Sequence, residues 1–350
     1  MSMQTLVSPE NIESTLVTIW EGLAKKNKVR ACLFNLVVYT KRDPRSDSFR
    51  EVVMKVIENY PCRIIFLSHD RESSSSYLKT AVSVVDIKNG SDTACDTIDM
   101  GFGGSGAEKV FFVLLPHLVP DLPIHLLWLD PPSKKHALFA QLEPLCDRLI
   151  IDSGSCPTFR TFLSGMREYL PEKTSHISDL NWTRTSPWRH LLAAEFRTER
   201  EKALLQQAKE IRIVYNGEKN PYIPHPKTET LYLIFWLANR LGWTVKKSSE
   251  LALHFSPTNV QIEARNAPSL RPGALISLEI LSGENRFCFQ RKLEASSEIA
   301  VRITSKEKCA LPRTISIPKE TRGASLSAEM VKKQTNQQYL DTMELLIRSW

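Results

Sequence analysis

The sequence of 350 residues predicts an α/β protein with two domains. In the first half, short apolar runs alternate with segments whose apolar residues recur at helical spacing, which indicates a mostly parallel sheet with helices on both faces. Between residues 244 and 304 the pattern changes to short alternating segments, which favour an antiparallel sheet. The polar stretch at 170–178 contains a proline and separates the two patterns. We therefore expect an N-terminal α/β domain at 1–175 and a C-terminal α+β domain at 176–350.

The elements of the first domain follow from this alternation. Residues 10–27 have the apolar spacing of an amphipathic helix. Asn89-Gly90 is a frequent turn between antiparallel strands, so a hairpin is expected to join the parallel sheet there. The remaining elements are expected in the order strand 31–40, helix 47–59, strand 62–67, hairpin strands 78–87 and 93–99, helix 107–118, strand 124–129, helix 133–143, strand 148–152 and helix 157–169.

In the second domain, helices are expected to precede the sheet. Pro187 suits the first position of a helix, with Ser186 as its N-cap, and Gly242 suits the end of another. Four or five short strands should follow, and a helix from about Ser325 should close the chain. The expected elements before the short strands are helices 186–195 and 198–208, strand 210–215 and helix 228–241. The last helix carries an apolar stripe that should pack on the second domain, formed by Tyr339, Met343, Leu346 and Trp350.

Composition restricts the class of protein. Hydrophobic residues make up 42% of the chain and charged residues 24%, which is typical of a folded globular protein. No apolar run approaches the ~20 residues of a membrane helix, so no membrane association is expected. The N-terminus lacks a basic region followed by an apolar core, so a secretory signal is not expected. Seven cysteines without paired spacing suit a reducing cytoplasm, where we expect the protein to reside.

The charge is unevenly distributed along the chain. Residues 1–175 carry 20 Lys and Arg against 21 Asp and Glu, whereas residues 176–350 carry 26 against 18. A basic half can favour an acidic protein surface, a phosphorylated ligand or nucleic acid. The basic residues are scattered and no nucleic-acid motif accompanies them, so we expect no nucleic-acid partner. A solvated basic surface is the simplest interpretation.

The segment at 179–196, DLNWTRTSPWRHLLAAEF, combines tryptophans with basic side chains. Arginine beside tryptophan is the composition of many interface hot spots, which makes this segment a candidate partner-binding surface. Buried tryptophans are also a common structural anchor, and Arg184 can pair with Asp179, so a purely structural role is the alternative. The candidate partner-binding residues are Trp182, Arg184, Trp188 and Arg189.

A second segment, VFFVLLPHLVPDLPIHLLWLDPP at 110–132, has a proline corner at 120–123 in which Asp121 can hydrogen-bond locally. Together with the segment at 179–196, it resembles the OpcA family of glucose-6-phosphate dehydrogenase assembly proteins. RACLFNLVVYT, PCRIIFLSHD, CDRLIIDSGS and LIFWLANRLGW agree with the same family in the same order. The resemblance extends from about Arg30 to Trp243. It implies a non-catalytic cytoplasmic protein of the pentose phosphate pathway that binds the dehydrogenase and, as an allosteric effector, favours its active oligomeric form.

A glycine loop offers a different function. Gly101, Gly103 and Gly106 match G-x-G-x-x-G before an expected helix, and Asp130 ends the next expected strand, where a dinucleotide site could place its ribose-binding acid. The alternative function is therefore a nucleotide- or sugar-phosphate-binding enzyme or sensor, and a simple flexible turn is the plainest interpretation of the loop. The residues that could bind an anion there are Gly103, Gly104, Ser105 and Gly106.

The remaining residues give no sign of catalysis. The eight histidines lack the spacing of a metal site, and no nucleophile accompanies an identifiable base. We therefore expect no catalytic residue, no metal and no cofactor, and we expect glucose-6-phosphate dehydrogenase as the partner. The sequence leaves self-association open.

Overall fold

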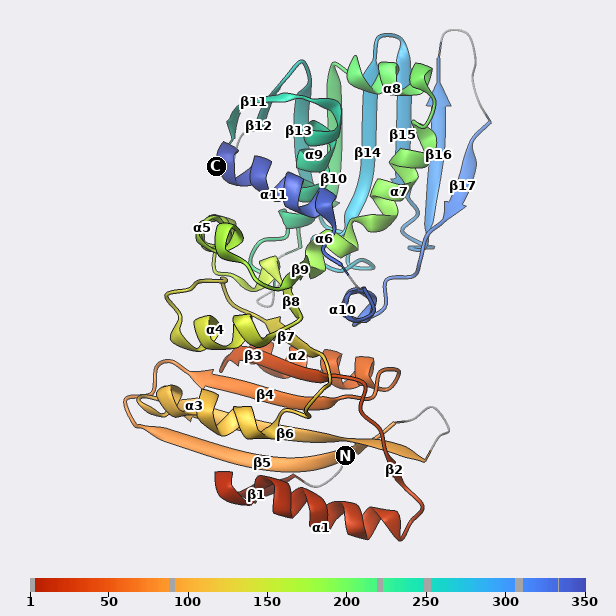
Figure 1. Cartoon of the computed structure of the whole chain (residues 1–350). Coiled ribbons are helices and arrows are strands. Elements are labelled where there is room, and N and C mark those ends of the chain that lie inside the picture. The colour runs from red at the N-terminus through yellow and green to blue at the C-terminus, as the bar shows by residue number, and fades with distance from the viewer. Residues whose placement is uncertain (1–3, 88–91, 219–222, 249–252, 306–310, 333) are drawn as a thin grey trace. The chain divides into compact units, whose positions relative to one another are not determined.

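The computed structural model describes residues 4–87, 92–218, 223–248, 253–305, 311–332 and 334–350 (Figure 1). They form two compact units, and the chain passes between the units more than once. Because the division is not at a single point, the units differ from the expected domains at 1–175 and 176–350. Unit 1 comprises Met1–Asp152, Gly165–Asp179 and Gly323–Gln334, and unit 2 comprises Ser153–Ser164, Leu180–Arg322 and Thr335–Trp350.

Unit 1 is built on a mixed sheet that has nine strands within the described residues. The strand order is β1-β5-β6-β4-β3-β7-β8-β9, with β2 also paired to β6. The six strands from β6 to β9 in this order are parallel, which is the arrangement of a doubly wound α/β sheet. The strands are β1 Thr5–Val7, β2 Val29–Arg30, β3 Asn35–Lys41, β4 Arg63–Asp70, β5 Tyr77–Asp86, β6 Thr93–Gly103, β7 Ile124–Trp128, β8 Arg148–Ile151 and β9 His176–Asp179.

Helices cover both faces of this sheet, as predicted. In Figure 1, α3 and α4 lie in front of the sheet and α2 lies behind it. The buried residues of the parallel strands are apolar on both faces, for example Leu36, Val37 and Val38 of β3, because both faces are covered. The helices are α1 Ile12–Ala24, α2 Pro44–Ile57, α3 Gly106–Leu114, α4 Ala137–Leu142 and α10 Ala324–Met330, and α5 Phe159–Tyr169 contributes residues to both units.

Unit 2 contains a sheet of eight strands within the described residues, in the order β11-β12-β13-β10-β14-β15-β16-β17. All neighbours are antiparallel except β10 and β13, which are parallel. The strands are β10 Glu210–Asn216, β11 Thr244–Ser248, β12 Leu253–Ser256, β13 Asn259–Arg265, β14 Leu275–Ser282, β15 Asn285–Arg291, β16 Glu298–Thr304 and β17 Arg313–Ser316. Its helices are α6 Leu180–Arg184, α7 Ser186–Glu195, α8 Glu199–Gln206, α9 Thr228–Leu241 and α11 Gln337–Ser349.

The predicted fold class is confirmed, with several corrections to its elements. The hairpin is present as β5 and β6, while its expected Asn89-Gly90 turn lies outside the described residues. Gly242 ends α9 with φ of +66°, as expected for a left-handed helix end. The expected linker at 170–178 contains most of β9, which pairs with β8. The expected C-terminal helix is two helices, α10 and α11.

The apolar stripe of the last helix packs as predicted. Tyr339, Met343 and Leu346 are buried, and α11 packs against α9 inside unit 2. Across the described residues, every helix is too short or too polar to span a bilayer.

Candidate functional site

The carboxyl edge of the parallel strands in unit 1 is the usual ligand position of this fold. Ligands of doubly wound sheets bind where the strand order reverses, and that point lies between β3 and β7. Polar side chains meet there from the ends of several strands and from the loops that follow them. We call this group the switch-point cluster, and it consists of Tyr39, His69, Arg71, Asp130 and His136.

The Tyr39 hydroxyl is at the centre of this cluster. It lies 2.9 Å from His69 Nδ1, 3.0 Å from His136 Nε2 and 3.1 Å from Arg71 Nη2. His136 Nδ1 accepts a hydrogen bond of 3.3 Å from the Phe139 backbone N–H, so the neutral ring carries its proton on Nε2 and donates to Tyr39. Because Arg71 also donates to the hydroxyl, the phenol proton is assigned to the bond with His69.

Asp130 completes the cluster through two cations. Arg71 Nη2 donates to Asp130 Oδ2 at 2.5 Å, and Lys41 Nζ lies 2.5 Å from Asp130 Oδ1. The carboxylate is 4% exposed. The sequence assigned Asp130 to a possible ribose contact, but in the structure this carboxylate pairs with two side chains of its own chain.

The electrostatics of the cluster do not suit acid–base catalysis. Burial, and after it the Arg71 charge, lowers the pKa of His136 to about 4. The same two causes lower the pKa of His69, and burial raises the pKa of the Tyr39 hydroxyl. At neutral pH both imidazoles are therefore uncharged and the phenol is protonated. A catalytic base works best with a pKa near the operating pH, so this arrangement favours a structural hydrogen-bond network.

The turn between β3 and α2 differs from a dinucleotide-binding turn. Such a turn is rich in glycine and directs a phosphate to the helix N-terminus. Here Asp43 precedes α2, and its Oδ1 accepts a hydrogen bond of 2.9 Å from the Ser46 backbone N–H. A carboxylate of the chain thus occupies the position of the phosphate, and its negative charge opposes phosphate binding.

The loop Gly101–Gly106 joins β6 to α3. A Cβ atom added to Gly106 would lie 2.0 Å from the Tyr77 carbonyl oxygen, so glycine is required there by a close backbone approach. Ser105 Oγ lies 2.6 Å from the Oγ atom of Ser76, the residue directly before Tyr77. The Tyr77 contact accounts for Gly106 without a ligand. Anion binding stays an untested prediction for Gly103, Gly104, Ser105 and Gly106.

The tryptophans of the segment at 179–196 lie inside unit 2. Trp182 is 2% exposed and Trp188 is 1% exposed, so they do not form the exposed aromatic surface that the sequence suggested. Arg189 is 8% exposed, and its guanidinium carbon lies 3.6 Å from the centre of the Trp182 ring. Its Nη1 donates to the Trp182 carbonyl oxygen at 2.7 Å and to Thr185 Oγ1. Arg189 therefore fixes α6 against α7.

The other residues of this segment also have local roles. Arg184 Nη1 donates to Asn181 Oδ1 at 2.7 Å, whereas the sequence suggested Asp179 as its partner. The helix expected at 186–195 is present with these bounds as α7, but its N-cap is Thr185 and not Ser186. Burial favours the structural interpretation of the segment. Contact with a partner stays an untested prediction for Trp182, Arg184, Trp188 and Arg189.

Sequence reasoning missed three members of the switch-point cluster: His69, Arg71 and His136. The available signal was the polar run SHDRE directly after the buried part of β4, because parallel strands end at one edge of a sheet. From the sequence, Asp121 was expected to hold the proline corner at 120–123 by a local hydrogen bond. In the structure Asn35 holds the chain beside it, since its Oδ1 accepts from the Val119 backbone N–H at 2.8 Å and its Nδ2 donates to the Val119 carbonyl at 3.0 Å.

Two family models match the chain in order. The N-terminal domain of the glucose-6-phosphate dehydrogenase subunit, of the OpcA assembly family, matches residues 54–168. The C-terminal domain of the same subunit matches residues 175–343. The two matches together cover most of the chain.

Similar curated proteins come from cyanobacteria. An OxPP cycle protein OpcA of Synechocystis sp. is 27% identical over 187 residues, which are 53% of this chain and 38% of that protein. The corresponding protein of Synechococcus elongatus is 28% identical over 188 residues, which are 52% of this chain and 40% of that protein. The chain thus spans about two fifths of the length of the curated relatives it matches.

Solved structures align with most of the chain. The super-repressor mutant of Gal80p from Saccharomyces cerevisiae aligns with a TM-score of 0.50 at 9% identity, over 91% of this chain and 95% of that one. The 3-ketoreductase KijD10 from Actinomadura kijaniata aligns with a TM-score of 0.47 at 8% identity, over 90% of this chain and 96% of that one. At such identities the likeness concerns the fold alone.

Proposed function

The chain belongs to the OpcA family of glucose-6-phosphate dehydrogenase assembly proteins, and we propose that it is a non-catalytic assembly factor and allosteric activator of that dehydrogenase. The observation that carries the proposal is the ordered match of both subunit domains, at 54–168 and 175–343. The seven cysteines of the sequence have no paired spacing, which supports action in a reducing cytoplasm.

The switch-point cluster supports a non-catalytic role. Arg71 and Lys41 both pair with Asp130 where this fold usually holds a ligand, and Asp43 caps the helix that would otherwise receive a phosphate. The neutral imidazoles of the cluster are weak bases at neutral pH. The chain's own side chains thus use the donors and acceptors that a nucleotide-dependent enzyme would offer to its cofactor.

The proposed mechanism is differential binding. The chain binds the active oligomeric form of the dehydrogenase more tightly than its other forms and so increases the population of the active form. The size of the effect is limited by the ratio of the two affinities: moving an equilibrium from 1:99 to 99:1 requires about a 10⁴-fold preference. The mechanism requires no catalytic residue. The basic half of the chain, at 176–350, would favour an acidic surface on the dehydrogenase.

The test uses the purified chain and the dehydrogenase of the same organism. We expect the two proteins to co-elute in size-exclusion chromatography, and we expect kcat to rise or KM to fall when the chain is present. An unrelated protein at the same mass concentration controls for non-specific stabilisation. Separate elution together with unchanged kinetics would refute the proposal.

The alternative enzyme function has its own test. Calorimetric titration of the isolated chain with NAD and with NADP should give no saturable heat if the loop Gly101–Gly106 serves only packing. The alternative would be favoured over the assembly role by two results together. Either nucleotide would bind with micromolar affinity, and a substitution that adds a charge at Ser105 would abolish this binding.

A further inference from the structure

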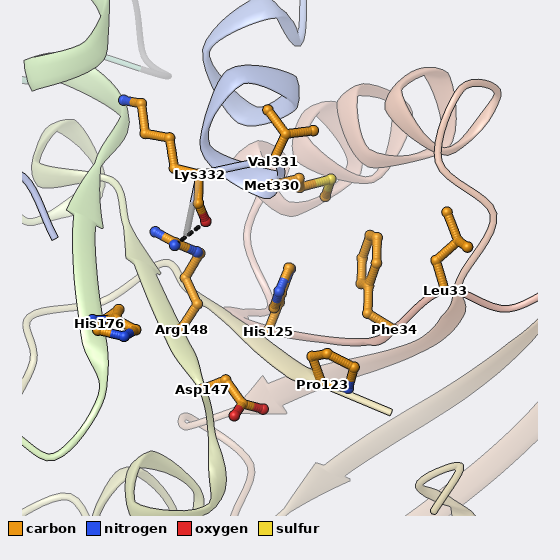
Figure 2. A pocket seen from close by; sticks show the side chains of 10 residues that line it. All are labelled: Leu33, Phe34, Pro123, His125, Asp147, Arg148, His176, Met330, Val331 and Lys332. Carbon is orange, nitrogen blue, oxygen red and sulfur yellow. Dashed lines mark hydrogen bonds between the residues drawn. The ribbon is translucent and has the colours of Figure 1, made fainter. Parts of the chain in front are cut away.

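A cavity of about 310 Å³ lies at the amino edge of the parallel strands of unit 1, opposite the switch-point cluster. It is lined where β3, β7, β8 and β9 begin, and the end of α10 with the residues after it forms another wall (Figure 2). All of its lining residues belong to unit 1. The volume lies at the lower end of the range of small-molecule sites, which is about 300–1,000 Å³.

One wall of the cavity is apolar. Phe34 and Met330 are buried, whereas Leu33 is 57% exposed and Val331 is 56% exposed. In Figure 2 the side chains of Leu33 and Phe34 lie on one side, with Met330 and Val331 above them. Exposed aliphatic side chains beside buried ones offer surface that the apolar part of a ligand would remove from water.

The other wall holds a buried cation. Arg148 is 3% exposed, and its Nη2 donates to the Lys332 carbonyl oxygen. Its Nη1 is buried and has no hydrogen-bond partner within the described part of the chain. His125 beside it is 9% exposed, and its Nδ1 also lacks a partner among the described residues. Buried polar atoms are rarely left unpaired, and a guanidinium N–H can only donate, so Arg148 Nη1 calls for an acceptor.

The charges around the cavity determine which acceptor fits. Burial lowers the pKa of the Arg148 guanidinium, and the Glu329 charge partly offsets this effect. Burial, followed by the Arg148 charge, lowers the pKa of His125 to about 4, so His125 is neutral at neutral pH. Asp147 lies at the rim, where its Oδ2 accepts a hydrogen bond of 2.8 Å from the Ile124 backbone N–H. In Figure 2 the Asp147 carboxylate lies away from the guanidinium. The ammonium of Lys332, another lining residue, pairs with Glu329, so Arg148 is the cation that we consider for the ligand.

We propose that this cavity binds a small organic acid, with its carboxylate on Arg148 and its apolar part on Phe34 and Met330. Carboxylates match the guanidinium fork better than neutral acceptors, and the charge-assisted bond is the stronger one. Nη1 is buried and the neighbouring Nη2 donates to the Lys332 carbonyl, so binding of the carboxylate requires the chain at Lys332 to shift. The site requires neither the dehydrogenase nor the switch-point cluster, and it goes beyond the proposed function.

The first test uses hexanoate as the probe on the intact chain, in isothermal titration calorimetry. We expect saturable binding of one hexanoate per chain. Acetate keeps the charge without the apolar part, and 1-hexanol keeps the apolar part without the charge. Both should bind at least about tenfold more weakly, which corresponds to about 1.4 kcal/mol. Hexanol binding as tightly as hexanoate, or no saturable hexanoate binding at all, would overturn the proposal.

The second test uses matched variants. Arg148→Met removes the cation, and Val331→Glu places a negative charge at the mouth of the cavity on a side chain that is 56% exposed. Val17→Glu is the control, because Val17 is 55% exposed on α1 and does not line the cavity. Hexanoate should bind at least tenfold more weakly to the first two variants and unchanged to the control. If Arg148→Met fails to fold, Val331→Glu decides, and affinity equal to that of the native chain would overturn the proposal.

Discussion

The two edges of the unit 1 sheet satisfy their polar groups to different degrees. At the carboxyl edge, the Tyr39 hydroxyl contacts three nitrogens and Asp130 pairs with two cations. At the amino edge, the buried side chains of Arg148 and His125 each retain a nitrogen without a partner among the described residues. The edge that usually binds ligands in this fold is thus closed by the chain itself, while the opposite edge presents a cavity beside a buried guanidinium with one unpaired nitrogen.

This difference shows that a fold does not determine where its chemistry occurs. The switch-point cluster consists of residues that would look catalytic in a list, yet they contact one another and their imidazoles are neutral. Around the amino-edge cavity the residue types are less suggestive, but the hydrogen bonding is incomplete. The ligand site that we propose therefore rests on the cavity and the unpaired Arg148 nitrogen and not on residue type.

The largest expected effect concerns Glu143, a buried carboxylate that precedes β8. It accepts hydrogen bonds from Lys134 Nζ at 2.7 Å, Tyr169 Oη at 2.9 Å, the Thr174 backbone N–H at 3.0 Å and Ser175 Oγ at 3.0 Å. Glu143→Ala should lower the free energy of unfolding by about 3–5 kcal/mol, because these groups lose a common acceptor. Urea denaturation measures the loss. A loss below about 1 kcal/mol would show that the hydrogen bonds to Glu143 contribute little to stability.

Glu143 also predicts a pH dependence. Burial alone would raise its pKa, but hydrogen bonds from Lys134, Thr174 and Tyr169 lower it to about 2. Because this value is below the unfolded value of about 4.3, the stabilisation is complete above about pH 4.3 and is lost as the pH falls toward 2. Glu143→Gln should flatten the stability profile in this window. Equal slopes for the variant and the native chain would contradict the assignment.

The second prediction concerns the carboxyl-edge glycine loop. Gly106→Ala would bring a Cβ atom within 2.0 Å of the Tyr77 carbonyl oxygen, whereas a Cβ atom at Gly101 meets nothing within 4 Å. We expect Gly106→Ala to cost about 2–3 kcal/mol and Gly101→Ala to change stability by less than about 1 kcal/mol. Thermal denaturation of both variants is the measurement. If Gly106→Ala is as stable as Gly101→Ala, the close approach of the Tyr77 carbonyl does not explain why residue 106 is a glycine.

The third prediction compares two buried arginines in different units. Arg189 donates to the Trp182 carbonyl oxygen and to Thr185 and stacks on the Trp182 ring, whereas Arg148 donates to the Lys332 carbonyl oxygen. Arg189→Met should lose about 2 kcal/mol, because it leaves bonded groups unpaired, and Arg148→Met should lose less than about 1 kcal/mol. The Arg189→Met variant should activate the dehydrogenase less only to the extent that less of the variant is folded. Loss of activation at full stability would instead assign Arg189 to partner contact.

The smallest expected effect compares one histidine from each edge. His136 is bonded through both ring nitrogens, whereas His125 has an unpaired Nδ1 within the described structure. His136→Leu should cost about 1–2 kcal/mol, and His125→Leu should lie within about 0.5 kcal/mol of the native chain. Chemical denaturation at pH 7 measures both changes. A larger loss of stability for His125→Leu than for His136→Leu would contradict the claim that the hydrogen bonding is less complete at the amino edge.

Much of the fold could be predicted from the sequence, because burial on both faces gives the parallel strands continuous apolar runs. β9 was missed since its sequence, HISD, is polar, and only pairing with β8 identifies it as a strand. The C-terminal helix was predicted as one element because the apolar stripe of α11 is strong, while the grouping of Gly323–Gln334 with unit 1 is a tertiary property. Such long-range packing leaves no local pattern.

The site was less predictable than the fold. The composition of 179–196 indicated tryptophans and arginines with a specific role. It could not distinguish a buried structural anchor from a partner-binding surface, because both use tryptophan and arginine. The glycine spacing was visible, but its cause, the Tyr77 carbonyl beside Gly106, lies in another segment of the chain. The amino-edge cavity combines residues from Leu33 to Lys332, and no sequence motif joins them.

The most direct test of the central claim is sedimentation of the dehydrogenase with increasing amounts of this chain, with activity measured in the same samples. The account predicts that the chain shifts the dehydrogenase toward one oligomeric form, that activity rises at the same chain concentration, and that the chain alone turns over no substrate. An unchanged oligomer distribution with unchanged activity, or turnover by the isolated chain, would contradict it.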